Sequence, residues 1–341
     1  MVHLIKVIMK YSLIQLGILY QVTQGFLIYL LSSKPSILIL NPIKSTKKIA
    51  IFAVYRKSFD WATDLTLCEL KKRGFHIVFV SNCSLSQDFI HQLKNKADIV
   101  IQRGNYGRCI AAFKAAYLFL YDKNFYGAKD MLLLNDTMIF PVADSHFFWK
   151  DLDRSKADVA GIFESNEFGY HLQSYFLYCK NKVFLNQNFY NFWVKYMPFN
   201  SKQLIIKYGE LGFSEMLSHH NISTYAFINE SKLRKLIANK KTWIAENQIL
   251  SSWGNSLSVY ITGLDFNANP SHIYALLSLK FLHLPLMKTD LISAGSYSKQ
   301  QIMSFLKTVK TSANKDLILS SLKSKQDRSF IHKLKSYMGM L

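Results

Sequence analysis

The chain alternates short apolar runs with stretches of helical periodicity, and this alternation predicts the fold class. Apolar runs of strand length cover residues 49–55, 75–80, 97–102, 131–134, 158–163 and 174–179. Helical patterns cover residues 60–73, 88–96, 105–120, 189–196 and 212–219. Strands that alternate with helices usually form a parallel sheet with crossover helices. The pattern therefore predicts an α/β fold with a mostly parallel sheet flanked by helices.

The two ends of the chain differ from this pattern. Residues 11–33 carry no formal charge and have lysines on both sides, but three glutamines interrupt them. This favours a helix lying on the cytoplasmic face of a membrane over a full span, and a helix packed on the domain is the alternative. From residue 302 onward the chain is basic and helical in pattern, which is typical of a second membrane-surface element or of a solvated helix.

The net charge of the chain limits the kinds of binding partner that can be expected. The formal net charge of +20 implies an anionic partner, which is a nucleic acid, an anionic membrane or a phosphorylated substrate. The cations are scattered and no nucleic-acid-binding motif occurs, so no nucleic acid is expected as a partner. The four cysteines lack close spacing, which indicates a reducing compartment and neither a disulfide framework nor a zinc site.

A polar triplet follows the fourth predicted strand. Asn135, Asp136 and Thr137 come directly after the apolar residues 131–134. Open α/β sheets bind ligands at the carboxyl ends of their strands, so the triplet is a candidate site. The alternative is a turn closed by hydrogen bonds from these side chains to the backbone.

Four segments together resemble the rhamnan synthesis protein F family, glycosyltransferases of bacterial surface polysaccharide assembly. They are RGNYGRCIAAF (103–113), LLLNDTMIFP (132–141), YHLQSYFLYCKNKVF (170–184) and NPSHIYALLSLKFLHLPLMKTDLI (269–292). Their order and spacing also match, and the resemblance covers residues 48–295. It implies a GT-A-like fold, a nucleotide-sugar donor such as dTDP-rhamnose, and a polysaccharide or lipid-linked glycan acceptor.

The resemblance also implies a donor site. GT-A enzymes usually hold Mg or Mn with a D-x-D motif at a strand end, where this chain has the single carboxylate of Asp136. Asp136 is therefore the predicted metal ligand, and a basic side chain is the alternative partner of the leaving diphosphate. Cys109 stands where the family often has an acidic residue. The predicted donor and diphosphate contacts are Arg103, Asn105, Gly107, Arg108, Asn135, Asp136, Thr137 and His272.

The acceptor side needs a general base, because inversion at the anomeric carbon removes a proton from the attacking hydroxyl. The resemblance favours Glu210 as this base, with Glu215 as the second candidate. The alternative for both is an acid at a helix N-terminus, stabilised by the helix dipole. The predicted acceptor-side residues are Glu164, His171, Gln173 and Ser174.

These observations predict an inverting glycosyltransferase on the cytoplasmic, inner face of the cell membrane. Three parts are expected: residues 1–47 as an apolar helix and linker, 48–295 as the GT-A-like domain, and 296–341 as a basic helical tail. Two alternatives are a catalytically silent, membrane-associated assembly partner and a basic nucleic-acid-binding protein.

Overall fold

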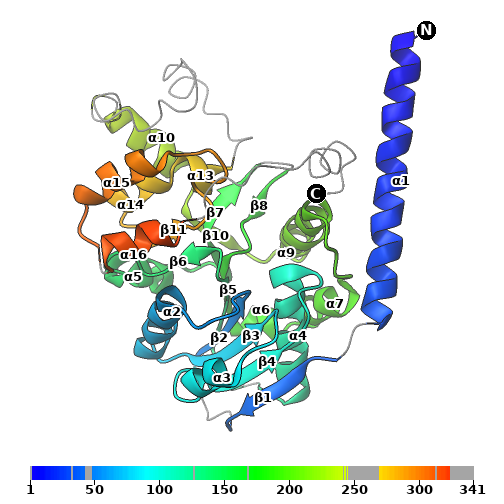
Figure 1. Cartoon of the computed structure of the whole chain (residues 1–341), viewed down its shortest axis with the longest axis horizontal. Helices are drawn as coiled ribbons and strands as arrows, with labels where there is room; N and C mark the ends of the chain where they lie inside the picture. The colour runs from blue at the N-terminus through cyan, green and yellow to red at the C-terminus, as the bar shows by residue number, and fades with distance from the viewer. Residues whose placement is uncertain are drawn as a thin grey trace.

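A computed structural model describes residues 2–322 apart from 32–33, 43–47, 126, 167–168, 241, 243, 245–268 and 312. Within these residues, a central sheet has the order β1-β4-β3-β2-β5-β9-β7-β10, and β8 pairs with β7 (Figure 1). The strands are β1 (Ser36–Leu40), β2 (Lys48–Val54), β3 (His76–Ser81), β4 (Ile99–Gln102), β5 (Asp130–Asn135), β7 (Val159–Ser165), β8 (His171–Leu172), β9 (Phe176–Lys180) and β10 (Thr224–Ile228).

The sheet is mixed but mostly parallel. Strands β2 to β5 are parallel neighbours, and β10 is parallel to β7. Strand β9 runs antiparallel between β5 and β7, and β1 is antiparallel to β4. The predicted α/β fold, which is Rossmann-like, is thus confirmed. Strand β1 lies in the stretch predicted as a linker, and the apolar pattern did not identify β10.

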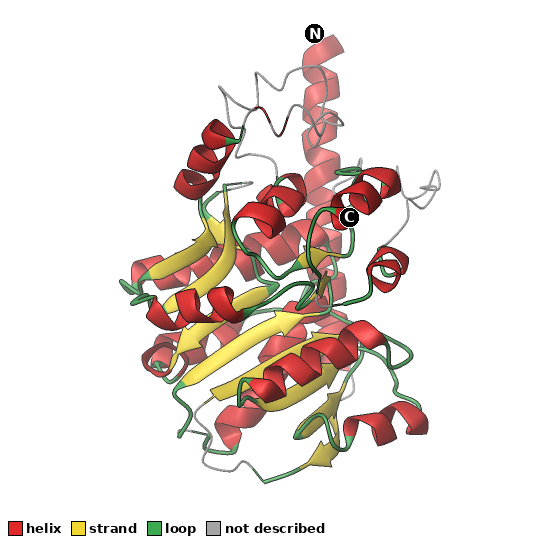
Figure 2. Cartoon of the chain, turned by 90° about the vertical axis from the view of Figure 1, so that its left-hand side faces the viewer, coloured by secondary structure: helices red, strands yellow, loops and turns green. Residues whose placement is uncertain are grey.

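Helices cover both faces of the sheet (Figure 2). Along β2, alternate residues enter two separate cores, with Ala50 and Phe52 in one and Ile49 and Ile51 in the other. This period of two is what a strand buried on both faces requires. One face packs against α2 (Trp61–Lys72), α3 (Gln87–Leu93), α5 (His146–Arg154), α10 (Glu230–Asn239), α13 (Pro270–Ile273), α14 (Ala275–Phe281), α15 (Lys299–Lys307) and α16 (Lys315–Ser320). The other packs against α4 (Arg108–Asp122), α6 (Asn181–Phe184), α7 (Gln187–Lys195), α8 (Lys202–Leu204) and α9 (Gly212–His219).

The described part of the C-terminal region packs onto the domain. Ile302 and Phe305 of α15 and Ile318 of α16 are buried in the same core as α14. Met303 of α15 and Leu317 of α16 remain exposed, however, so the prediction that this region is a membrane-surface or solvated element stays a prediction. Residues 323–341 lie outside the described residues, and the three-part division of the chain stays a prediction.

Helix α1 (Val2–Leu31) leaves the domain along one side (Figure 1). Ile18 and Val22 pack against the core that contains α4 and α7, while Leu19 and Leu30 remain exposed. Among the described residues, α1 included, we find no helix with the combination of length and hydropathy that a bilayer crossing requires. The helix thus contacts the domain through one part and presents apolar side chains elsewhere.

The carboxyl ends of the parallel strands meet at one edge of the sheet. Val54 of β2 pairs with Ser81 of β3, and Ser81 pairs in turn with Gln102 of β4. On the other side of β2, Ala53 pairs with Asn135 at the end of β5. The segments that follow these four strands therefore emerge side by side, and they build the candidate site.

Candidate active site

A cavity of about 690 Å³ opens at this edge of the sheet. Its walls come from the segments after β2, β3, β4 and β5, from the start of α4, from β8 and the residues after it, and from residues 202–210, 269–272 and 288–290. Most of the residues predicted from the sequence lie together here. They are Asn105, Arg108, Asn135, Asp136, Thr137, His171, Gln173, Ser174, Glu210 and His272.

Three predicted residues lie elsewhere and have other contacts. The Arg103 guanidinium donates 2.6 Å to Asn82 Oδ1 and also donates to the Tyr106 carbonyl, so it braces its own loop. Burial lowers the pKa of Arg103 to about 10. Glu164 accepts the Glu230 backbone N–H at 2.9 Å, at the start of α10. Glu215 is exposed in the first turn of α9, away from the cavity, so the structure does not support it as the base.

Gly107, also predicted as a donor contact, lies behind the cavity wall and shapes the start of α4. Its φ is 71°, and Arg108 follows with φ 50°, so two successive residues are left-handed. A Cβ at Gly107 would lie 2.5 Å from Pro198 Cβ and 2.6 Å from Ala111 Cβ. Only glycine fits both this conformation and this approach.

Gly107→Ala is expected to lower the free energy of unfolding by roughly 1–3 kcal/mol, from backbone strain and overpacking. Denaturant titration followed by circular dichroism measures this. Gly104→Ala in the same loop is the matched control, because nothing lies within 4 Å of its added Cβ. Equal stability of the two variants would contradict the expectation.

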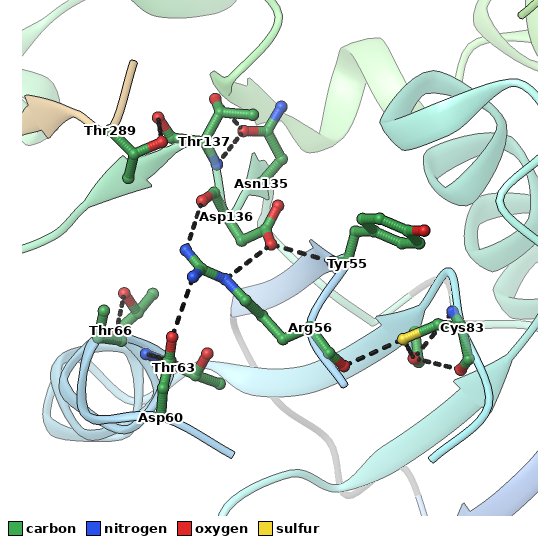
Figure 3. A network of polar contacts seen from close by, with 12 residues as sticks. Tyr55, Arg56, Asp60, Thr63, Thr66, Cys83, Asn135, Asp136, Thr137 and Thr289 are labelled. Atoms are coloured by element: carbon green, nitrogen blue, oxygen red, sulfur yellow. Dashed lines mark hydrogen bonds and ion pairs between the residues drawn. The ribbon is translucent and has the colours of Figure 1, made fainter. Parts of the chain in front are cut away.

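The polar triplet after β5 is both a turn and part of the cavity wall. Asn135 Oδ1 accepts the Thr137 backbone N–H at 3.0 Å and the Thr137 hydroxyl at 2.6 Å, which closes the predicted turn. Asp136 Oδ2 accepts the Tyr55 N–H at 3.0 Å and Arg56 Nε at 3.2 Å. Figure 3 shows the Arg56 side chain between Asp136 and Asp60, whose carboxylate lies 3.1 Å from Arg56 Nη1.

The contacts of Asp136 affect whether it can hold the predicted Mg or Mn. The described residues contain no group of three or more His, Cys, Asp or Glu side chains arranged to hold a metal ion. Asp136 is already paired with a guanidinium, which repels a second cation at that oxygen. The described residues thus offer no preformed set of protein ligands for Mg or Mn. Four cations line the cavity, Arg56, Arg108, Lys202 and Lys288, and they outnumber its three carboxylates, Asp136, Glu210 and Asp290, which favours an anion.

Lys288 reaches the site through a small second sheet. Strand β11 (Met287–Lys288) pairs with β6 (Met138–Ile139), just after the polar triplet. Lys288 Nζ donates to Thr137 Oγ1 at 2.8 Å and lies 4.5 Å from the centre of the Tyr175 ring. Sequence reasoning missed Lys288, since its place depends on a pairing between residues about 150 positions apart.

His272 is held by the acid that follows Lys288. His272 Nε2 lies 2.9 Å from Asp290 Oδ1. Burial alone would raise the pKa of Asp290, but the His272 hydrogen bond and the Lys288 charge outweigh it and hold the pKa well below its usual range. Asp290 is therefore a permanent anion that fixes His272 on the cavity wall and is poorly suited to accept a proton.

Glu210 also lines the cavity and lies on the π-helix η1 (Ile205–Leu211). Glu210 Oε1 accepts the Ser174 N–H at 3.3 Å and the Ser174 hydroxyl, and Oε2 lies 3.7 Å from His171 Nε2. His171 Nδ1 lies 2.9 Å from the Gly169 carbonyl, so Nδ1 carries a proton and Nε2 faces the carboxylate. π-Helical turns often occur at functional sites, and this one presents a positioned carboxylate.

Two further residues complete the wall. Burial and the Glu210 charge raise the pKa of Cys109 to about 11, so its thiol is neutral at physiological pH. Arg108 is exposed at the start of α4, and within the described part of the chain its guanidinium makes no hydrogen bond or ion pair. A helix N-terminus beside an available guanidinium suits a phosphate group.

A Rossmann-like sheet with a cation-lined cavity at its carboxyl edge is typical of proteins that bind phosphorylated ligands. The family model of rhamnan synthesis protein F matches residues 77–252, which is half of the chain. The protein belongs to this family, as the sequence resemblance predicted, and membership supports a role in rhamnan or related polysaccharide synthesis.

One relative is similar in sequence to part of this chain. The uncharacterized protein y4gN of Sinorhizobium fredii (strain NBRC 101917 / NGR234) is 26% identical over 147 residues, which are 42% of this chain. The match spans 38% of the length of that relative.

Proposed function

We propose that the protein is an inverting glycosyltransferase with a GT-A-like domain. It moves a sugar, rhamnose or a similar one, from a nucleoside diphosphate to a growing surface polysaccharide or lipid-linked glycan. One observation carries the proposal: a single cavity combines a carboxylate held by two neighbours, Glu210, with cations suited to a diphosphate. The family membership supports the polysaccharide context.

The reaction forms one bond and breaks another at the anomeric carbon. An acceptor hydroxyl oxygen attacks this carbon, and its proton passes to Glu210. The bond between the carbon and the diphosphate oxygen breaks, and the electron pair leaves with the diphosphate. Hydrogen bonds from the Ser174 N–H and hydroxyl hold the Glu210 carboxylate in one orientation, which general base catalysis requires, and the His171 ring lies 3.7 Å away.

The leaving diphosphate gains negative charge in the transition state and needs cations that are already in place. Arg108, Lys202 and Lys288 line the cavity and supply this charge. Arg56 is bound to Asp136 and Asp60, so we assign it and Asp136 the role of holding the loops after β2 and β5 together. Mg or Mn that enters with the donor would add positive charge near Asp136, but the proposed reaction does not depend on it.

A donor screen tests this function. Purified full-length protein is incubated with an acceptor extract and a panel of nucleotide sugars that includes dTDP-rhamnose, with Mg, with Mn or with EDTA. We expect acceptor-dependent release of a nucleoside diphosphate from at least one donor, and the release persists in EDTA. Absence of release with every donor would favour a catalytically silent assembly partner, the alternative that Cys109 in place of the family's acidic residue also favours.

We further propose that the protein lies peripherally on the inner face of the cell membrane. Helix α1 exposes Leu16, Leu19, Phe26 and Leu30, and no acidic residue precedes Asp60 in the chain. Exposed apolar side chains and an excess of cations both favour an anionic lipid surface, and each cation near such a surface contributes about 1 kcal/mol.

Deletion of residues 1–34 is expected to move the protein from the membrane fraction to the supernatant, because it removes both the apolar side chains and three of the lysines. Fractionation followed by immunoblotting measures this. A full-length variant with Leu19→Glu and Leu30→Glu keeps the rest of the helix and is expected to shift in the same direction. Unchanged fractionation of both variants would rule out this localisation by α1.

A further inference from the structure

Helix α1 and the loop of residues 103–108 meet at one tyrosine. Tyr106 Oη lies 2.5 Å from the Gly25 carbonyl oxygen of α1 and also contacts the Pro198 carbonyl. Burial raises the pKa of Tyr106 to about 12, so its hydroxyl remains a donor at physiological pH. One hydroxyl proton is thus shared between α1 and the segment that follows α7.

The contact is closely fitted on the helix side. A Cβ at Gly25 would lie 2.9 Å from Tyr106 Oη and 3.5 Å from the Pro198 carbonyl oxygen, so glycine permits this approach. Nearby, Lys114 Nζ of α4 lies 5.2 Å from the centre of the Tyr29 ring of α1. Helix α1 is therefore attached to the domain at defined points, besides the packing of its apolar side chains.

The same loop reaches the cavity on its other side. Asn105 lies two positions into the loop and Arg108 ends it, and both line the cavity. The Arg103 guanidinium donates to the Tyr106 carbonyl and to Asn82 Oδ1, and Asn82 is itself part of the cavity wall. The Gly107 N–H donates 3.0 Å to Asn200 Oδ1, close to Pro198. Tyr106 thus lies in the loop that joins α1 to Arg108, the cation of this loop that faces the cavity.

We propose that Tyr106 is a positioning residue that couples α1 to the anion site. When the exposed apolar face of α1 binds an anionic lipid surface, the helix is immobilised, and Tyr106 holds the loop of residues 103–108 in the conformation that presents Arg108 to a diphosphate. The diphosphate as the occupant of the cavity rests on the proposed function. By linkage, lipid binding and diphosphate binding strengthen each other by the same factor.

The loop has a physical reason to depend on this support. Gly107 and Arg108 are both left-handed, and a left-handed arginine is disfavoured unless the surrounding contacts hold it. If the Tyr106 hydrogen bonds are lost, the loop can relax and Arg108 loses its fixed position. The expected consequence is faster local opening of the loop and weaker anion binding, without unfolding of the sheet.

Hydrogen exchange of the full chain tests whether lipid binding by α1 affects the loop, with no nucleotide or pyrophosphate present. Backbone amides of residues 103–109 are followed with and without vesicles of phosphatidylglycerol and phosphatidylcholine. In the wild type, vesicles are expected to slow exchange there about fivefold or more. Tyr106→Phe is expected to exchange faster without vesicles and to lose the response, although it still sediments with them. Gly25→Ala, which disturbs the same contact from the helix side, is expected to behave alike.

Tyr20→Phe is the matched control, because it removes a hydroxyl from an exposed tyrosine of α1 and should keep the wild-type response. Calorimetry with pyrophosphate gives a second readout: vesicles should tighten binding about fivefold in the wild type and in Tyr20→Phe only. A wild type that ignores vesicles, or a Tyr106→Phe variant that keeps the full response, overturns the proposal. Loss of sugar transfer in the donor screen with an intact exchange response would instead overturn only the proposed function.

Discussion

Glu210→Gln is expected to lower the rate of sugar transfer by about 100- to 10,000-fold, the usual effect of losing a general base. The amide keeps the shape of the side chain and can still bond Ser174, but it cannot take the proton of the acceptor hydroxyl. The loss should appear in kcat, with little change in the affinity for the donor. Initial rates of nucleoside diphosphate release at saturating donor measure it.

Glu215→Gln is the matched control for this variant. Glu215 lies five residues further along, exposed on α9 and outside the cavity, so its loss should leave the rate within about twofold of the wild type. If Glu215→Gln were the inactive variant and Glu210→Gln the active one, the assignment of the base would be wrong. Comparable denaturation midpoints would show that neither effect comes from unfolding.

Lys288→Ala is expected to lower kcat by roughly 100-fold or more, in the range found when one preorganised donor to a developing charge is removed. The Lys288 ammonium is held by Thr137 and the Tyr175 ring before any ligand binds, so the diphosphate meets a cation that needs no reorganisation. Lys288→Arg keeps the charge and should retain part of the rate. Lys299→Ala, at an exposed start of α15, should be neutral.

The metal dependence of the same variants separates two sources of positive charge. If side chains neutralise the diphosphate, EDTA should leave the wild-type rate largely unchanged, and Mg or Mn should not restore Lys288→Ala to the wild-type rate. Rates in EDTA and in excess Mg or Mn test this. Complete loss of wild-type activity in EDTA would contradict the account and return Asp136 to the role of a metal ligand.

The sequence predicted the sheet well because each buried parallel strand is a continuous apolar run. β2, β3 and β5 fall where the runs at 49–55, 75–80 and 131–134 indicated. Asp60 begins α2 as a cap, with its carboxylate accepting the Thr63 N–H at 2.8 Å. The two-residue β11 exists only because it pairs with β6, so no local pattern could reveal it.

The sequence predicted which residues line the cavity better than it predicted which side chains they contact. Asp136 and Glu210 were both expected at the site, and both line the cavity. Nothing in the sequence showed that Arg56 pairs with Asp136, since the two residues approach only when β2 and β5 pair. Likewise, Arg103 was expected to face a phosphate, but side-chain direction in a loop is set by tertiary contacts, and it turns to Asn82.

Ser174 illustrates the same limit on the acceptor side. The pattern of residues 170–184 marked it as part of the site, and the structure places it in the cavity wall. Its partner could not be predicted, because the contact with Glu210 joins the segment before β9 to the π-helix. Roles that depend on pairs of residues thus needed the structure, while the presence of Ser174 at the site did not.

A crystal structure with a bound nucleoside diphosphate, dTDP first, tests the central claim most directly. The account predicts the diphosphate at the carboxyl edge of the sheet, within hydrogen-bond distance of Arg108 and Lys288, with the Glu210 carboxylate facing the space that the sugar would occupy. A nucleotide bound outside this cavity, with Arg108 and Lys288 both away from its phosphates, would contradict it.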